Sequence, residues 1–208
     1  MIKQKEEKNL IVGLDIGTSK IVAIVAELQP DGLLNVIGLG QHSSKGLKKG
    51  VVINIDSTVE AIQRAIEEAE LMANCKITDV YTGIAGSHIK SINSHGMVKI
   101  KDTEVSQLDV DKVIETACAI TLPNDQQVLH ILTQEYVIDG QEDVRQPLGM
   151  SGMKLEVKVH IVTGAIAAAQ NIVKCIKRCG LEVSELVLQP LASSMAVLTD
   201  RSEEHTSE

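Results

Sequence analysis

The residues with the clearest chemical potential lie in one short segment, Gly13-Leu14-Asp15-Ile16-Gly17-Thr18-Ser19-Lys20. Apolar runs on both sides of it predict a strand, a tight turn and a second strand. Gly17 allows the backbone to approach phosphate oxygens, and successive N–H groups of the turn can form an anion-binding nest. Asp15 can hold Mg²⁺ through the water shell of the ion. The other polar residues of the turn can donate hydrogen bonds or offset phosphate charge: Thr18, Ser19 and Lys20.

A plain β-hairpin with a polar turn explains the same eight residues, because short motifs often match by chance. The segment is not a P-loop, which needs a lysine directly after its second glycine and a helix after the loop. Here Lys20 follows Gly17 by three positions, and β-branched residues come next. The segment therefore predicts either a phosphate-binding turn or an ordinary hairpin.

The composition bounds the class of protein. A chain of 208 residues can bury a sizeable core, on the order of 70% of its unfolded surface. Tyr81 and Tyr136 are its only aromatic residues, and its net charge is −8. Both features argue against a nucleic acid as partner, since such partners favour basic and aromatic surfaces. We expect no signal peptide or membrane span, because the first apolar run stops at Asp15.

The four cysteines do not form a metal-binding pattern. Cys175 and Cys179 are four residues apart on an expected helix, and no CxxC pair occurs. Free thiols in a reducing cytosol explain all four cysteines, so we assign no zinc site.

The first part of the chain has the pattern of an α/β domain. Strands are expected at 9–15, 20–28 and 33–40, followed by a solvated loop that contains Lys45, Lys48 and Lys49. A capping box at Ser57-Thr58-Val59-Glu60 predicts the start of a helix that ends at Asn74. A strand at 77–85 completes a βαβ pattern.

The middle of the chain has a different pattern of polar and apolar residues. We expect a polar loop at 87–101, a helix at 107–120, a strand at 128–137, a loop at 139–152 and a half-buried strand at 154–162. The α/β pattern then returns with a helix at 165–179 that Gly180 ends, and a short apolar strand at 186–188. The chain therefore reads as an α/β unit interrupted by an inserted module.

With these elements in place, residues 8–200 resemble the N-terminal half of the FtsA family of actin-like bacterial cell-division proteins. The resemblance rests on stretches spread in order along the chain: 13–20, 64–73, 128–131, 134–136, 149–152 and 192–194. It implies an α/β, actin-like (ribonuclease H-like) subdomain 1A at 1–85 and 163–200. It also implies that the insertion at 86–162 is a small α+β subdomain 1C.

The resemblance implies a nucleotide site. Asp15, Gly17, Thr18, Ser19 and Lys20 would form the first phosphate loop for ATP, and Asp15 would hold Mg²⁺ through water. Gln189 falls in a segment that helps to place the attacking water, which makes it a catalytic candidate, although capping of a strand end explains a polar residue there as well. The full-length protein is expected to have weak or no ATPase activity. The fragment is expected to bind ATP poorly and to be inactive.

The partners that the resemblance implies are those of a cell-division adaptor at the inner face of the cytoplasmic membrane, where the septum forms. The full-length protein would polymerise into filaments, bind FtsZ through a subdomain 2B and bind the membrane through a C-terminal amphipathic helix. Neither of those two parts is expected in this sequence. Later division proteins would bind subdomain 1C, whose polar loops and Lys99 and Lys101 suit recognition.

Other functions share the same turn. A sugar or acetate kinase would need a catalytic carboxylate and a sugar-binding insert, and the insert here has no dense cluster of Asp, Asn, Arg and aromatic residues. A pilus-assembly relative of the same superfamily is a further alternative. Residues 201–208 fit nothing before them and match a translated sequencing adapter, so we expect a non-native tail on a sequence truncated near residue 200.

Overall fold

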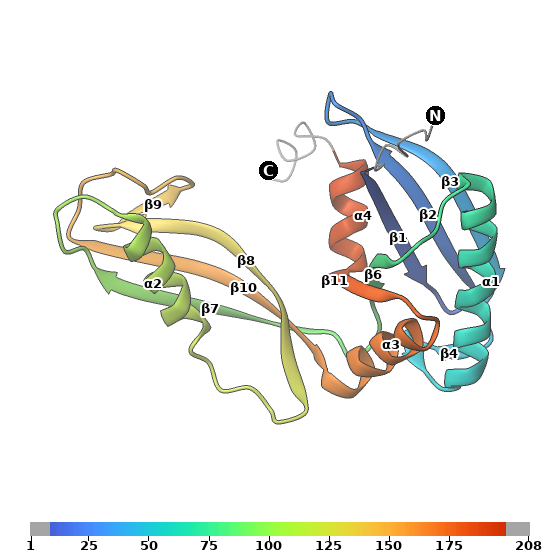
Figure 1. The fold of residues 1–208 in the computed structure, drawn as a ribbon. Coiled ribbons are helices and arrows are strands. Elements are labelled where there is room, and N and C mark those ends of the chain that lie inside the picture. The colour runs from blue at the N-terminus through green and yellow to red at the C-terminus, as the bar shows by residue number, and fades with distance from the viewer. Residues whose placement is uncertain (1–8, 199–208) are drawn as a thin grey trace. The chain divides into compact units, whose positions relative to one another are not determined.

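A computed structural model describes residues 9–198, and these fold into two compact units (Figure 1). The first unit comprises the described residues up to Ser87 and from Ala167 onward, and the second unit is His88–Ile166. The sequence predicts the inserted module at 86–162. Both boundaries of the second unit lie a few residues later in the chain than this prediction. The tail expected at 201–208 lies outside the described residues.

A five-stranded mixed sheet forms the centre of the first unit. Its strand order is β11-β6-β1-β2-β3. The three strands expected at the N-terminus are confirmed as an antiparallel meander of β1 (Leu10–Ile16), β2 (Lys20–Leu28) and β3 (Leu34–Ser43). On the other side of β1 lie two parallel strands, β6 (Asp79–Ile84) and β11 (Glu182–Leu188). A separate two-stranded hairpin consists of β4 (Leu47–Lys48) and β5 (Val51–Val52).

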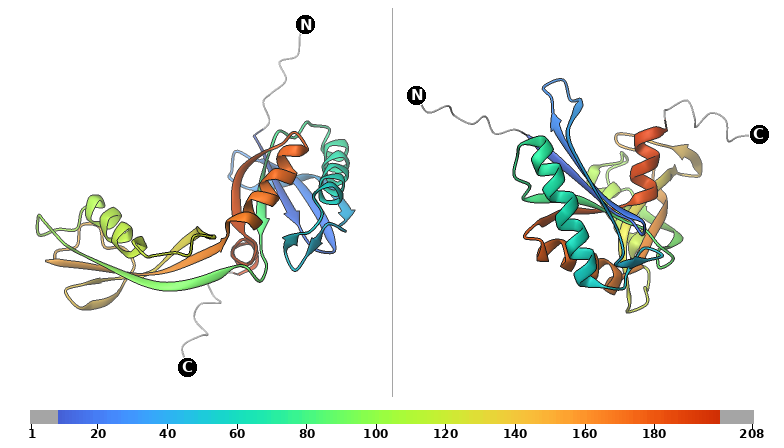
Figure 2. Two further views of the ribbon diagram at one scale, coloured as in Figure 1. Left: turned by 90° about the horizontal axis from the view of Figure 1, so that it is seen from below. Right: turned by 90° about the vertical axis from the view of Figure 1, so that its right-hand side faces the viewer.

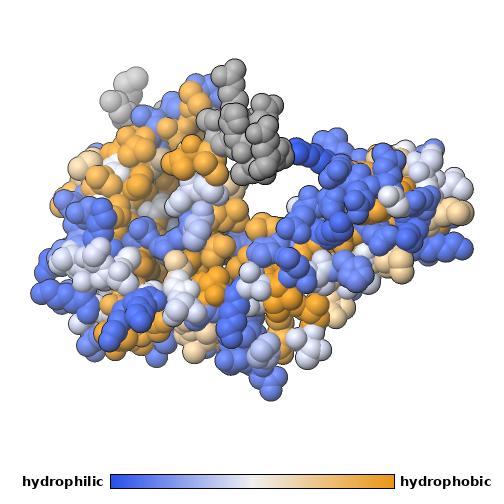
Figure 3. Space-filling view, turned by 180° about the vertical axis from the view of Figure 1, so that it is seen from behind, coloured by the Kyte–Doolittle hydropathy of each residue, from blue (hydrophilic) through white to orange (hydrophobic). Residues whose placement is uncertain are grey.

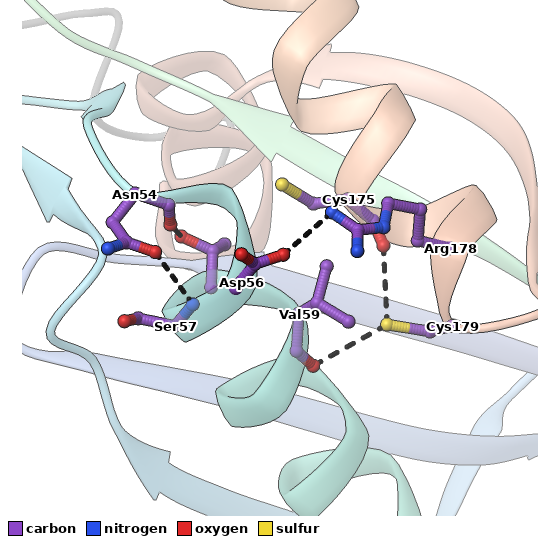
Figure 4. Close-up of polar contacts among 8 residues, drawn as sticks. Asn54, Asp56, Ser57, Val59, Cys175, Arg178 and Cys179 are labelled. Atoms are coloured by element: carbon purple, nitrogen blue, oxygen red, sulfur yellow. Dashed lines mark hydrogen bonds and ion pairs between the residues drawn. The ribbon is translucent and has the colours of Figure 1, made fainter.

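The helix α1 (Ile55–Ala73) packs against β2 and β3. The predicted capping box at Ser57 is wrong: Asn54 is the N-cap, and its side chain accepts a hydrogen bond from the backbone N–H of Ser57 at 2.9 Å (Figure 4). Asn is as good a cap as Ser, so the helix gains a turn at its start. The predicted end is confirmed, because Asn74 is the C-cap and has the left-handed φ of 47°.

Two glycines let α1 approach the sheet closely. A Cβ at Gly40 would lie 1.8 Å from the carbonyl oxygen of Ala65, and one at Gly38 would lie 2.7 Å from that of Ala69. Both distances are far shorter than a van der Waals contact, so the backbone of α1 lies almost directly on β3. The alanines of α1 that face the strand are buried.

The helix α3 (Ile166–Arg178) contacts the first turns of α1 (Figure 4). Arg178 pairs with Asp56 at 2.8 Å, and the thiol of Cys179 donates to the carbonyl oxygens of Cys175 at 3.2 Å and Val59 at 3.6 Å. Burial raises the pKa of Cys179 to about 11, with a smaller contribution from Cys175. These contacts join two helices that are more than a hundred residues apart in the sequence.

The second unit is a four-stranded antiparallel sheet with one helix on it. The strand order is β7-β10-β8-β9. Figures 1 and 2 both show α2 (Gln107–Cys118) along one face of this sheet. The strands are β7 (Lys90–Lys99), β8 (Gln126–Ile138), β9 (Gln141–Val144) and β10 (Lys154–Ala165).

Two loops predicted in this unit are wrong. The segment 87–101 contains the ten-residue strand β7, and 139–152 contains β9. Both are edge strands of the sheet, so their polar residues face water and give no strand signal. Gly96 marks close packing rather than a break in the strand, because a Cβ there would lie 2.3 Å from the carbonyl oxygen of Val113 in α2.

The predicted alternation along β10 is confirmed. Leu155, Val157, Val159 and Ile161 are fully buried against α2 and the other strands. Charged side chains occupy the opposite face, where the Nζ of Lys158 lies 2.6 Å from a carboxylate oxygen of Glu135. Figure 3 shows the surface of this unit, at the right of the picture, as mainly hydrophilic. Among the described residues, no helix is both long and apolar enough to cross a lipid bilayer.

Candidate functional site

The strand register places Asp15 on the face of the first sheet that α1 does not cover. Leu14 in β1 pairs with Ala23 in β2, and Ala23 pairs with Gly40, which lies against α1. Since side chains alternate along a strand, Asp15 must point to the opposite face. The polar end of β1 therefore opens away from the helix that anchors the sheet.

The turn between β1 and β2 is as tight as the sequence predicts. The backbone N–H of Gly17 donates to the carbonyl oxygen of Lys20 at 3.0 Å. A Cβ at Gly17 would lie 2.8 Å from that same oxygen, so a larger residue would have to distort the turn. The N–H of Ser44 donates to the carbonyl of Ser19 at 3.0 Å, which ties the turn to the end of β3. Thr18, Ser19 and Lys20 remain exposed.

Gln189 lies beside this turn. It is the first residue of α4 (Gln189–Val197), directly after β11, and its side-chain amide donates a hydrogen bond to the carboxylate of Asp15. A Cβ at Gly83 would lie 2.4 Å from the Cγ of Gln189, so the glycine makes room for that side chain. Because β1 pairs with β6 and β6 pairs with β11, the end of β1 with Asp15 and the end of β11 with Gln189 lie at one site.

The pKa of Asp15 is raised above its ordinary value, first because the surrounding protein removes water from the carboxylate. The positive charge of Lys20 and the hydrogen bond from Gln189 act in the opposite direction. The Asp15 carboxylate is thus partly desolvated, but the charge of Lys20 and the hydrogen bond from Gln189 stabilise it, as suits a ligand for a hydrated cation.

These residues line a cavity of about 410 Å³. All six residues predicted from the sequence border it: Asp15, Gly17, Thr18, Ser19, Lys20 and Gln189. Other residues that line the cavity were not predicted from the sequence. They come from the β4–β5 turn and from the end of β6 and the turn after it: Lys49, Gly50, Gly83, Ala85 and Gly86. Lys49 is therefore not simply part of a solvated loop. The available signal was the dipeptide Lys49-Gly50 between Leu47-Lys48 and the apolar pair Val51-Val52, since a glycine at the second position can form a two-residue hairpin turn.

The cavity suits an anion with a hydrated cation. Glycine backbone on several sides leaves room for phosphate oxygens, and the lysines supply positive charge. No group of three or more His, Cys, Asp and Glu side chains in residues 9–198 is arranged to hold a metal directly. A single carboxylate such as that of Asp15 suits Mg²⁺ held largely through water, which is how Mg²⁺ commonly binds beside phosphates.

Comparison with known proteins connects this geometry to a family. Residues 86–163 match the model for the SHS2 domain inserted in FTSA. The chain is 59% identical over 195 residues to the cell division protein FtsA of Pseudomonas aeruginosa, covering 94% of this chain and 47% of that protein. It is 47% identical over 200 residues to FtsA of Escherichia coli K12, covering 96% of this chain and 47% of the relative. The chain thus spans about half the length of the curated relatives it matches.

A solved structure shows the same fold with little sequence similarity. The PilM-PilN type IV pilus biogenesis complex matches with a TM-score of 0.61 at 16% identity, over 89% of this chain and 49% of that chain. At this identity the likeness concerns the fold alone, and the pilus-assembly alternative draws no support from it. The expected α/β, actin-like fold with an inserted small domain is confirmed. The ordered sequence matches and the inserted SHS2 domain together identify the chain as a member of the FtsA family of cell division proteins, corresponding to about half of such a protein.

Proposed function

We propose that the cavity at the β1–β2 turn holds the phosphates of ATP with Mg²⁺. The observation that carries the proposal is the convergence of Asp15, the Gly17 turn, Lys20 and Gln189 on one cavity. Asp15 would hold the ion through water, the turn would donate backbone N–H groups to phosphate oxygens, and Lys20 would offset their charge. When bound, Mg²⁺ neutralises part of the phosphate charge.

We further propose that Gln189 orders groups around Asp15, either the carboxylate itself or an attacking water. Its amide already donates to Asp15, so at most one N–H remains for water. A single N–H to direct the water favours slow hydrolysis or binding alone. This agrees with an adaptor that uses the nucleotide to control assembly.

At the level of the whole protein, we propose an actin-like filament that tethers the FtsZ ring to the inner face of the cytoplasmic membrane. The chain spans about half the length of these relatives, and we assign FtsZ and membrane binding to the half that it does not span. The second unit would serve as subdomain 1C and recruit later division proteins. Lys99, at the end of the edge strand β7, is exposed and available for such contacts.

The nucleotide proposal is tested in a hybrid in which this chain replaces the matched part of the P. aeruginosa protein, to which it is 59% identical. We expect the hybrid to bind Mg-ATP in calorimetry. Asp15→Asn and Lys20→Ala should each weaken binding and filament formation. Lys45→Ala is the control, because this nearby exposed lysine does not border the cavity. Equal affinities for all four proteins would exclude the site.

The chain alone should bind Mg-ATP only weakly. Exposed ion pairs contribute on the order of 0–1 kcal/mol each, and two or three of them with backbone hydrogen bonds reach about millimolar affinity. Calorimetry on residues 9–198 measures this directly. Binding tighter than about 10 micromolar, or about 7 kcal/mol, would mean that this half holds a complete site.

A further inference from the structure

We infer that Lys49, at the tip of the β4–β5 hairpin, is a second cationic contact for the phosphates. This inference rests on the proposed nucleotide site and adds a residue that the motif around Asp15 does not contain. The charged residues that border the cavity are Asp15, Lys20 and Lys49. The cavity wall is thus net positive in a chain whose net charge is −8, as expected for a site that attracts anions.

The backbone at Lys49 is unusual for a lysine. Lys48 pairs with Val51, so Lys49 and Gly50 form a two-residue hairpin loop, with φ of 51° and 78°. Such a turn requires positive φ at both residues and favours Asn-Gly, Asp-Gly or Gly-Gly. A lysine in this conformation is disfavoured by steric contacts of its Cβ. Strained residues of this kind concentrate at functional sites, and here the strained residue borders the cavity.

Gly50 holds the hairpin tip against the other wall of the cavity. A Cβ at Gly50 would lie 2.1 Å from the carbonyl oxygen of Ala85 and 2.8 Å from the Cα of Gly86. Ala85 and Gly86, which follow β6, border the same cavity. The tip therefore has backbone contact with a neighbouring element of the first unit, which limits where Lys49 can lie.

The chemistry of the ligand requires more positive charge than Lys20 supplies. A triphosphate keeps net negative charge after it binds one Mg²⁺, and Asp15 adds a further negative charge to the site. Lys20 can balance only part of this. Lys49 comes from a different element, so the two ammonium groups can contact separate phosphate oxygens. Lysine can meet a phosphate oxygen as a compact point charge on a flexible stem.

The test compares Lys49→Asn with Lys49→Arg in the hybrid protein described above. Asn is favoured in this turn, so Lys49→Asn should fold at least as well as the parent while removing the charge. We expect its affinity for Mg-ATP to fall about two- to fivefold, as for the loss of one exposed ion pair, with a weaker dependence on salt. Lys49→Arg should retain most of the affinity. Lys48→Asn is the matched control, since this exposed neighbour does not border the cavity.

Three outcomes would overturn the inference. Unchanged Mg-ATP affinity in Lys49→Asn, while Lys20→Ala still weakens binding, would exclude Lys49 and leave the proposed function standing. An equal loss for adenosine, which has no phosphates, would assign Lys49 a structural role. A hybrid that binds no Mg-ATP at all would overturn the proposed function and this inference with it.

Discussion

The side-chain amide of Gln189 donates a hydrogen bond to the carboxylate of Asp15, although 174 positions separate the two residues. The contact joins the end of β1 to the start of α4, on the sheet face that α1 leaves uncovered. Asp15 is the residue that we propose holds the hydrated cation, and the hydrogen bond from Gln189 occupies one of its carboxylate oxygens.

Replacing Gln189 with Met should raise the pKa of Asp15. The hydrogen bond from the amide stabilises the carboxylate, and methionine has a similar size but no donor. Carboxyl-carbon NMR titration of the parent and the variant measures the shift. Gln170→Met, on the exposed side of α3, is the control. An unchanged or lower midpoint for Asp15 would show that the contact does not form in solution.

Gly40→Ala should destabilise the first unit by about 1–3 kcal/mol or more, as expected for overpacking. The new Cβ would lie 1.8 Å from the carbonyl oxygen of Ala65, and neither the helix nor the strand backbone can yield without losing contacts. Urea denaturation gives the difference in the free energy of unfolding. Gly13→Ala is the control in the same sheet, because nothing lies within 4 Å of its Cβ. Similar stabilities for the two variants would mean that α1 lies farther from β3 than described.

Ser106→Ala should lower the free energy of unfolding by about 1 kcal/mol at neutral pH, as for loss of an N-cap. Ser106 and Asp109 form a capping box at the start of α2, in which each side chain bonds the backbone N–H of the other residue. The hydrogen bond from the Ser106 hydroxyl is the main reason that the pKa of Asp109 is lowered.

The pH dependence of this effect follows from the sign of the shift. A lowered pKa means that the stabilisation is present above the ordinary value of 3.8 and is lost as the pH falls through the folded-state pKa. The difference between parent and Ser106→Ala should therefore shrink in strong acid. Thr116→Ala, which loses only a bond to the carbonyl of Lys112 within the same helix, should show no such trend. A difference that stays constant with pH would contradict the role of Asp109.

The thiols of Cys175 and Cys179 should react slowly with iodoacetamide in the folded chain. Burial raises the pKa of both, to about 11 for Cys179, so little thiolate is present near neutral pH. A variant with Ser at positions 75 and 118 isolates these two groups. We expect slow labelling at about pH 8.5, the ordinary thiol pKa, and fast labelling in urea. Equal rates in the two conditions would show that the contact between α1 and α3 is open.

Much of the fold follows from local patterns in the sequence. The alternation of Leu155, Val157, Val159 and Ile161 with polar residues predicts β10, because a strand with one buried face has an apolar side chain at every second position. Asn74 and Gly180 mark helix ends because few residues adopt positive φ readily. The Asp15–Lys20 turn could likewise be predicted from the sequence, since Gly17 and its polar neighbours lie between two apolar runs. The strands β7 and β9 could not be predicted from the sequence, because edge strands that face water lack an apolar pattern.

The composition of the site was decided by tertiary structure. Sequence spacing relates Asp15 to Lys20 only. Lys49 reaches the same cavity because Gly50 packs against Ala85, and Gln189 reaches Asp15 because parallel pairing places β11 next to β6 and β6 next to β1. Such pairings depend on the burial of whole strands and helices, which no single segment encodes. The sequence by itself therefore predicted the turn that we propose binds phosphate, and only the folded sheet decided which distant side chains lie beside it.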